Sequence, residues 1–185
     1  MKPFLFFSIF SLLFLTFLIA SQSVTAQNSI YKTCKTFAQN DPNVNYNFCT
    51  TSLQAYPASQ NATLQELGMI SIRLIRYNIT DTRFYIKNLI KNKKWDSYTQ
   101  QSLSDCFELF SDAIPSVKKA MKYYNKKLYG DADVQLSAVM DDATTCEDGF
   151  NEGGVVSPLT KRTGDAFQLS AIALSAVRML QTGSN

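Results

Sequence analysis

The sequence predicts an all-α protein, an up-down four-helix bundle with an N-terminal helical hairpin and two disulfides. Apolar residues recur at spacings of three and four along most of residues 64–128, which is the period of an amphipathic helix. Helix-capping residues stand before the helical stretches, and no Asn-Gly hairpin or alternating run indicates a sheet. Long helices joined by short links pack as antiparallel neighbours, so we expect one bundle with the hairpin as an appendage.

Residues 1–26 have the pattern of a secretory signal peptide. Lys2 provides the basic start, residues 4–20 are almost wholly apolar, and small residues precede a cleavage site after Ala26. The apolar run borders on the length of a membrane anchor, but the cleavage site and the absence of basic residues directly after the run favour removal. We therefore expect residues 27–185 to be secreted as one domain, with no membrane segment after cleavage.

Residues 27–58 are predicted to form the helical hairpin. A short helix around residues 30–37 carries Cys34. Asp41 and Pro42 are typical of a helix start, with Asp as the N-cap and Pro at the first helical position. We therefore expect the second helix to begin at this pair and to carry Cys49.

Residues 62–185 are predicted to form the bundle. The run Thr63-Leu-Gln-Glu66 is a capping-box pattern, and the helix that follows it runs to about Asn92. A second helix spans residues 98–128, where Pro115 predicts a kink or a short break.

The last two bundle helices are expected over residues 132–150 and 163–180. The inward face of the helix over residues 132–150 is predicted to consist of residues that are small and polar for a core: Val134, Ala138, Asp141 or Asp142, Thr145 and Cys146. In the preceding Tyr-rich run, we expect Tyr124 in the core and Tyr129 exposed.

The four cysteines indicate two disulfides, because an oxidising compartment favours their pairing. Cys34, Cys49, Cys106 and Cys146 can pair in three ways, of which the sequential pairing, Cys34 with Cys49 and Cys106 with Cys146, is the simplest. In the same compartment, the sequons that begin at Asn61 and Asn78 are candidate glycosylation sites, and Asn61 is the better one.

Composition and motifs argue against catalysis, a metal site and nucleic-acid binding. The chain has no His, which excludes a Ser-His-Asp nucleophile and His-ligated zinc. The adjacent carboxylates at 141–142 and 147–148 point about 100° apart on a helix, so neither pair faces one substrate as a catalytic pair would. Asp131 and Asp133 stand at a helix start, where a carboxylate interacts favourably with the helix dipole. Without residues 1–26 the chain has 17 Lys and Arg, one fewer than the total of 18, against 15 Asp and Glu. We predict no catalytic residue, no metal, no cofactor and no nucleic-acid partner.

The residues around the cysteines resemble those of the plant invertase and pectin methylesterase inhibitors. The motifs that carry the resemblance are TCKTFAQNDPNVNYNFCTTSL with Cys34 and Cys49, LSDCFELFSDAI with Cys106, VQLSAVMDDATTCEDGF with Cys146, and a last helix of the form LSAIALSAVRML. The match covers essentially all of residues 27–185, and it looks closest to the secreted invertase inhibitors found among plant pollen proteins.

The resemblance implies a secreted protein of the apoplast and cell wall that binds a carbohydrate enzyme, one to one, and covers its active-site cleft. It also implies one disulfide in the hairpin and one in the bundle. Invertase inhibitors of the tobacco type carry a Pro-Lys-Phe motif before the third bundle helix. Here that place falls at Tyr129, Gly130 and Asp131, where the motif is absent. These residues are therefore possible target contacts only if the target is invertase, and LSAVMDDATTC favours pectin methylesterase as the target.

Two alternatives remain beside inhibition of pectin methylesterase. The first is inhibition of an acid invertase of the cell wall or vacuole. The second is a secreted helical carrier or allergen-like protein with no enzyme target, which would enclose an apolar cavity. For any of them, the absence of His predicts that the charge of the free protein changes little between pH 5 and 7.5.

Overall fold

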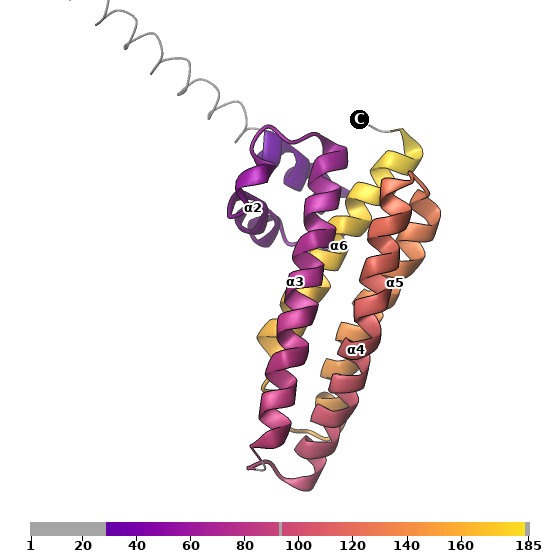
Figure 1. The fold of residues 1–185 in the computed structure, drawn as a ribbon. Coiled ribbons are helices and arrows are strands. Elements are labelled where there is room, and N and C mark those ends of the chain that lie inside the picture. Colours follow the sequence, from indigo (N-terminus) through magenta and orange to yellow (C-terminus); the bar gives the residue numbers. More distant parts are fainter. Residues whose placement is uncertain (1–28, 93, 184–185) are drawn as a thin grey trace, which may run out of the picture.

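The structure, a computed structural model, describes residues 29–92 and 94–183. In this part of the chain all regular structure is helical, so the all-α prediction is confirmed. Four long helices form the bundle: α3 (Leu64–Lys91), α4 (Ser97–Asn125), α5 (Tyr129–Glu152) and α6 (Thr160–Thr182). Helix α3 packs against α4 and α6, and α5 packs against the same two helices (Figure 1). The predicted signal peptide lies outside the described residues.

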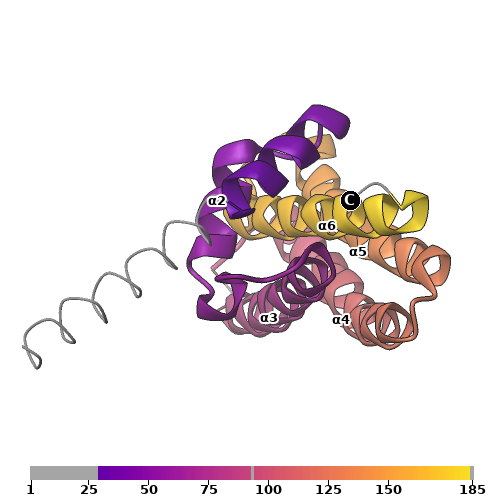
Figure 2. The same ribbon diagram turned by 90° about the horizontal axis from the view of Figure 1, so that it is seen from above.

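The helical hairpin packs on one end of the bundle. It consists of a helix over residues 29–40, α2 (Tyr46–Gln54) and the short 3-10 helix η1 (Pro57–Ser59). Figure 2 shows α6 between the hairpin and the pair formed by α3 and α4. Every side chain of α6 from Leu169 to Val177 is therefore buried, because one side of the helix faces the bundle and the other faces the hairpin.

The prediction that α2 begins at Asp41 and Pro42 is wrong. The N-cap is Asn45, whose Oδ1 accepts a hydrogen bond of 2.9 Å from the backbone N–H of Phe48. Asp41 instead ends the preceding helix: its own N–H donates to the carbonyl of Phe37, and its carboxylate accepts from the N–H of Asn43. The Asp-Pro pair therefore forms the turn between the two hairpin helices.

Local signals set the start of the first two bundle helices. Thr63 and Glu66 form the predicted capping box, with the Glu66 N–H bonded to the Thr63 hydroxyl and the Thr63 N–H bonded to the Glu66 carboxylate. Asp96 caps α4. This helix continues through Pro115 without the break that we considered, because Pro115 lies on the exposed side, where water can reach the carbonyl left without an N–H partner.

The prediction of which α5 residues face the core is wrong except for Cys146. Val134, Ala138, Asp141 and Thr145 are exposed, and Asp142 is half-buried. The face that packs in the core consists of Ala132, Leu136, Val139, Ala143, Cys146 and Phe150. Burial of Leu, Val and Phe side chains stabilises the fold more than burial of small polar ones, so the larger apolar residues determine which side of α5 faces inward.

Tyr124 packs in the core against the only glycine within α3, Gly68. Its Oη donates a hydrogen bond of 2.8 Å to the carbonyl of Gln65. A Cβ added to Gly68 would lie 2.1 Å from this Oη and 2.9 Å from the ring carbon that bears it. The glycine therefore provides the space that the tyrosine occupies.

Candidate inhibitory surface

Both disulfides are present, and they join the cysteines in sequential order. Cys34–Cys49 links the two helices of the hairpin, and Cys106–Cys146 links α4 to α5 in the bundle core. Of the three possible pairings, the structure therefore has the simplest. All four cysteines are oxidised, and no group of three or more potential metal ligands gathers within residues 29–92 and 94–183.

Carboxylates concentrate on one side of the bundle, here called the α4–α5 face and defined by Asp105, Asp112, Asp141, Asp142, Asp148 and Glu152. Three of them, Asp105, Asp148 and Glu152, line a cavity of about 270 Å³ beside the Cys106–Cys146 disulfide. Asp142 lies near Asp112 and Asp141, and its partial burial together with these two negative charges raises its pKa from 3.8 to about 6. This group is therefore an exception to the expectation that the charge of the free protein changes little between pH 5 and 7.5.

The other candidate carboxylates on α5 hold helices together. Asp133 accepts from the Nε of Arg178 on α6 at 3.2 Å, and the same guanidinium reaches the carboxylate of Asp41 in the hairpin at 3.4 Å. Glu147 accepts hydrogen bonds from the hydroxyls of Thr160 and Thr163. These groups have structural partners within the chain, and this arrangement fits a protein that performs no catalysis.

The three residues proposed as invertase contacts lie within the first turn of α5. The connection from α4 to α5 is residues 126–128 only, with Lys127 at a φ of 59°. Helix α5 begins at Tyr129, three residues earlier than expected. Tyr129 is half-buried rather than exposed, and its ring meets the ring of Tyr124 edge-on at a centroid distance of 5.4 Å. Gly130 and Asp131 are exposed beside it, so no loop projects here.

Helix α3 presents an exposed row of residues that the sequence reasoning missed. The row, here called the α3 stripe, consists of Arg73, Tyr77, Thr80, Phe84, Lys87 and Lys91. Their spacings of four and three residues place them on one side of the helix, opposite the buried face with Ile72, Ile75 and Ile79. Tyr77 is 58% exposed and Phe84 is 62% exposed. Two aromatic residues on the polar side of a predicted amphipathic helix were the signal in the sequence.

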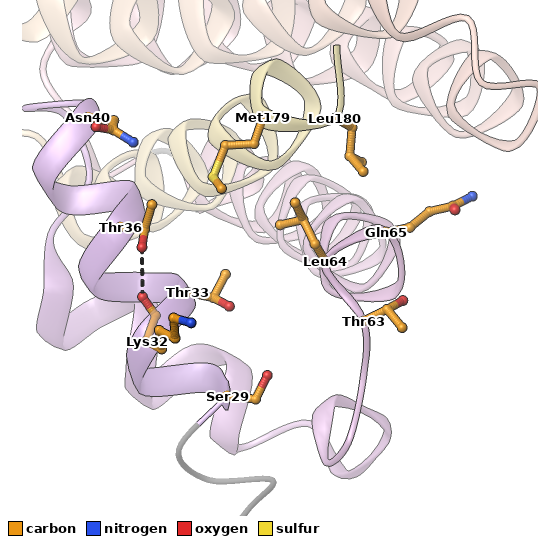
Figure 3. Close-up of a pocket in the computed structure, with 10 residues that line it drawn as sticks. All are labelled: Ser29, Lys32, Thr33, Thr36, Asn40, Thr63, Leu64, Gln65, Met179 and Leu180. Carbon is orange, nitrogen blue, oxygen red and sulfur yellow. Dashed lines mark hydrogen bonds between the residues drawn. The ribbon is translucent and has the colours of Figure 1, made fainter. Parts of the chain in front are cut away.

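A surface cavity separates the helix at residues 29–40 from the bundle (Figure 3). It measures about 730 Å³ and is open to solvent. Leu64 and Met179 give it an apolar side, and the hydroxyls of Ser29, Thr33 and Thr63 give it a polar one. In Figure 3 the side chain of Gln65 points away from the other labelled residues. The cavity is thus an open groove with polar and apolar sides, unlike the enclosed apolar cavity that the carrier alternative requires.

The two sequons differ in their surroundings. Asn61 is exposed in the link between η1 and α3, with a φ of 63°. Asn78 lies in the middle of α3, where its Nδ2 contacts the carbonyl of Arg162 on α6 at 3.5 Å and its Oδ1 is buried. A glycan is attached through Nδ2, so the structure favours Asn61 as the acceptor.

The described helices include none that is both long and apolar enough to cross a membrane.

Comparison with known proteins places the chain among plant inhibitors. Residues 28–175 match the model of the family described as plant invertase/pectin methylesterase inhibitor. A Platanus acerifolia protein named "Putative invertase inhibitor" is 42% identical over 168 residues, which are 90% of this chain and 93% of that protein. Pectinesterase inhibitor 12 of Arabidopsis thaliana is 30% identical over 157 residues, which are 84% of this chain and 90% of that protein.

A solved structure has the same fold. The mutant form A of a pectin methylesterase inhibitor from Arabidopsis superposes with a TM-score of 0.66 at 23% sequence identity, over 73% of this chain and 89% of that one. The match of the family model to most of the chain, together with the relatives at 30% identity or more, shows that the chain belongs to the plant invertase/pectin methylesterase inhibitor family.

Proposed function

We propose that this protein inhibits a cell-wall pectin methylesterase by binding, one to one, over its active-site cleft. The observation that carries the choice of target is the short link between α4 and α5. Residues 126–128 form a tight turn, and Tyr129, Gly130 and Asp131 already belong to α5. No segment projects at the place where inhibitors of the tobacco invertase type carry their inserting motif.

The fold suits the blocking of a cleft. Two disulfides and a core of fully buried aromatic and aliphatic side chains hold the helices in one arrangement. A rigid surface loses little conformational entropy on association, so more of the contact free energy appears as affinity.

Inhibition of an acid invertase is the second candidate. It is favoured by the relatives from Platanus acerifolia and Platanus orientalis, which are both named "Putative invertase inhibitor" and are 42% and 44% identical to this chain. The pectinesterase inhibitors are 30% identical or less. If invertase is the target, Tyr129, Gly130 and Asp131 are the contacts to test first.

We also propose that residues 1–26 direct secretion to the apoplast and are removed, leaving residues 27–185. N-terminal sequencing of the protein secreted by plant cells tests this part. A first residue at Gln27 supports it, and an intact N-terminus retained in membranes contradicts it.

The test of function is one assay of the purified protein against a pectin methylesterase and an acid invertase. We expect inhibition of the methylesterase, unchanged in Tyr129→Ala and Asp131→Ala. Inhibition of invertase alone, weakened by either substitution, would establish the second candidate instead. A protein that inhibits neither enzyme would contradict the proposed function and leave the carrier alternative.

A further inference from the structure

The Cys106–Cys146 disulfide lies at a surface cavity between α4 and α5. Both cysteines line this cavity of about 270 Å³, here called the disulfide cavity, and their Cα atoms are 4.8 Å apart. The other disulfide differs, because Cys34 and Cys49 are fully buried in the core of the hairpin. A small reagent in solvent therefore has a path to the disulfide of the bundle, and the hairpin disulfide presents no surface to it.

A glycine leaves the disulfide cavity open. Gly149 lines the cavity and follows Cys146 by three residues on α5. Side chains three residues apart share one face of a helix and lean toward its N-terminus, so a side chain at position 149 would lie over the turn that carries Cys146. A Cβ added to Gly149 would meet nothing within 4 Å beyond its own helical turn. Glycine is unfavourable inside a helix, and no close packing requires it here. Its effect at this position is to leave the disulfide uncovered.

The charge of the disulfide cavity is negative. Asp105 of α4 and Asp148 and Glu152 of α5 line it and are exposed, and no basic residue lines it. Within the described part of the chain, none of the three carboxylates forms an ion pair. Their combined field disfavours the approach of an anion and favours a neutral or cationic molecule.

We propose that the Cys106–Cys146 disulfide is a thiol–disulfide exchange site, which small thiols with neutral or cationic substituents reach through the disulfide cavity. The thiolate of the incoming reagent attacks one cysteine sulfur, and a mixed disulfide forms as the Cys106–Cys146 bond breaks. The electron pair of the broken bond leaves with the other cysteine as a thiolate, which takes a proton from water.

A second molecule of the thiol completes the reaction. Its thiolate attacks the reagent sulfur of the mixed disulfide, releases the remaining cysteine as a thiolate and leaves as the oxidised, disulfide form of the reagent. Two electrons have then passed to the protein, and α4 and α5 have lost their covalent link. This inference goes beyond the proposed inhibition and does not depend on which enzyme is the target.

The first experiment compares the two disulfides of the folded protein. Limited reduction with cysteamine, followed by alkylation of the free cysteines and peptide mapping, gives the rate at each pair. We expect Cys106 and Cys146 to be released at least about 10-fold faster than Cys34 and Cys49. Faster release of the hairpin pair would overturn the inference.

The second experiment closes the disulfide cavity with Gly149→Leu. The matched control is Gly164→Leu on α6, where an added Cβ also meets nothing within 4 Å and where the neighbouring cavity is lined by neither cysteine of the pair. Both variants replace a helical glycine by a good helix former, so both should raise the melting temperature. We expect reduction of Cys106–Cys146 to be slowed about 10-fold in Gly149→Leu and less than about 3-fold in Gly164→Leu. No slowing in Gly149→Leu, or equal slowing in both variants, would overturn the inference, because exchange would then proceed through unfolding of the bundle.

The third experiment tests the selection by charge. Cysteamine is cationic, 2-mercaptoethanol neutral and 2-mercaptoethanesulfonate anionic, and their rates are compared at equal thiolate concentration because the thiolate is the nucleophile. At low salt we expect the rate to fall about 10-fold from the first reagent to the last. Asp105→Asn/Asp148→Asn/Glu152→Gln should remove most of this difference, as should high salt. An equal spread of rates in the parent and this variant would contradict the role given to the carboxylates.

Discussion

The two faces beside α4 differ in where their polar and aromatic side chains find partners. On the α4–α5 face, the Cys106–Cys146 disulfide joins the helices, and Tyr98 donates a hydrogen bond of 2.8 Å to the carbonyl of Gly149. On the α3 stripe, Tyr77 and Phe84 remain in solvent beside unpaired basic residues. The first face is thus engaged in holding the bundle together, and the second is available to another molecule.

The same comparison explains their charges. Carboxylates crowd on the α4–α5 face closely enough to raise the pKa of Asp142, a cost that the disulfide and the packed core beneath can offset. Basic residues on the α3 stripe lie in solvent and form no ion pair within residues 29–92 and 94–183. Substitutions on the α4–α5 face should therefore change stability, and substitutions on the stripe should change binding.

The largest effect on stability should follow removal of the disulfide under the α4–α5 face. Cys106→Ser/Cys146→Ser opens a loop of 40 residues and should cost roughly 4 kcal/mol of unfolding free energy, whereas Cys34→Ser/Cys49→Ser opens one of 15 residues and should cost roughly 3 kcal/mol. Denaturant unfolding of both variants measures the difference. A larger loss for the hairpin variant would contradict the central structural role given to the α4–α5 disulfide.

The next effect concerns the buried side of α3, opposite the stripe. Gly68→Ala places a methyl group against the Tyr124 ring and should lower the unfolding free energy by about 2 kcal/mol. Tyr124→Phe removes the nearest atom, so the double variant should lose less than the sum of the two single variants. Thermal melts of the four proteins form the cycle. Additive losses would show that the two residues do not compete for the same space.

A smaller effect should appear in the pH dependence of stability. Because Asp142 has a raised pKa of about 6 in the folded state, its protonation stabilises the fold fully below pH 3.8, and this contribution is lost as the pH rises through 6. Solvent screens the half-buried group, so we expect about 1 kcal/mol. Asp142→Asn should remove this part of the pH dependence, and Asp148→Asn is the control. Equal pH profiles for the parent and Asp142→Asn would contradict the assignment.

The smallest effect on the fold should come from substitutions in the two sequons, which should change only the attached glycan. In protein secreted from plant cells, Asn61→Gln should remove one glycan, and Asn78→Gln should leave the mass of the attached glycan unchanged, because Nδ2 of Asn78 faces α6. Intact-mass spectrometry measures both. A glycan on Asn78 would mean that this side of α3 is open before the bundle closes.

Local signals in the sequence were sufficient for the fold class and for several helix starts. The Thr63–Glu66 capping box acts within four residues, and the apolar period of α3 appears directly in the sequence. Sequential pairing of the cysteines followed from the hairpin and two neighbouring helices. In each case the residues that determine the structure lie close together in the chain.

Tertiary contacts determined what the sequence could not predict. Asp41 has the local pattern of an N-cap, but in the fold it is buried and faces Arg178, 137 residues away. The inward face of α5 depends on which residues α4 and α6 cover, and the motif around Cys146 did not reveal that. The α3 stripe was visible as aromatic residues on a polar face, but the expected partner is another protein.

The most direct test of the central claim is chemical footprinting of the tyrosines in the complex of this protein with the enzyme that it inhibits. Nitration of the free protein should modify Tyr77, Tyr31 and Tyr46, and reaction at Tyr98 reports on the α4–α5 face. The account predicts that saturating enzyme protects at least one exposed tyrosine of the bundle, Tyr77 or Tyr98, and leaves the reactivity of the two hairpin tyrosines unchanged. Full reactivity of both bundle tyrosines, with protection of Tyr31 and Tyr46 alone, would contradict it, because the enzyme would then cover the hairpin.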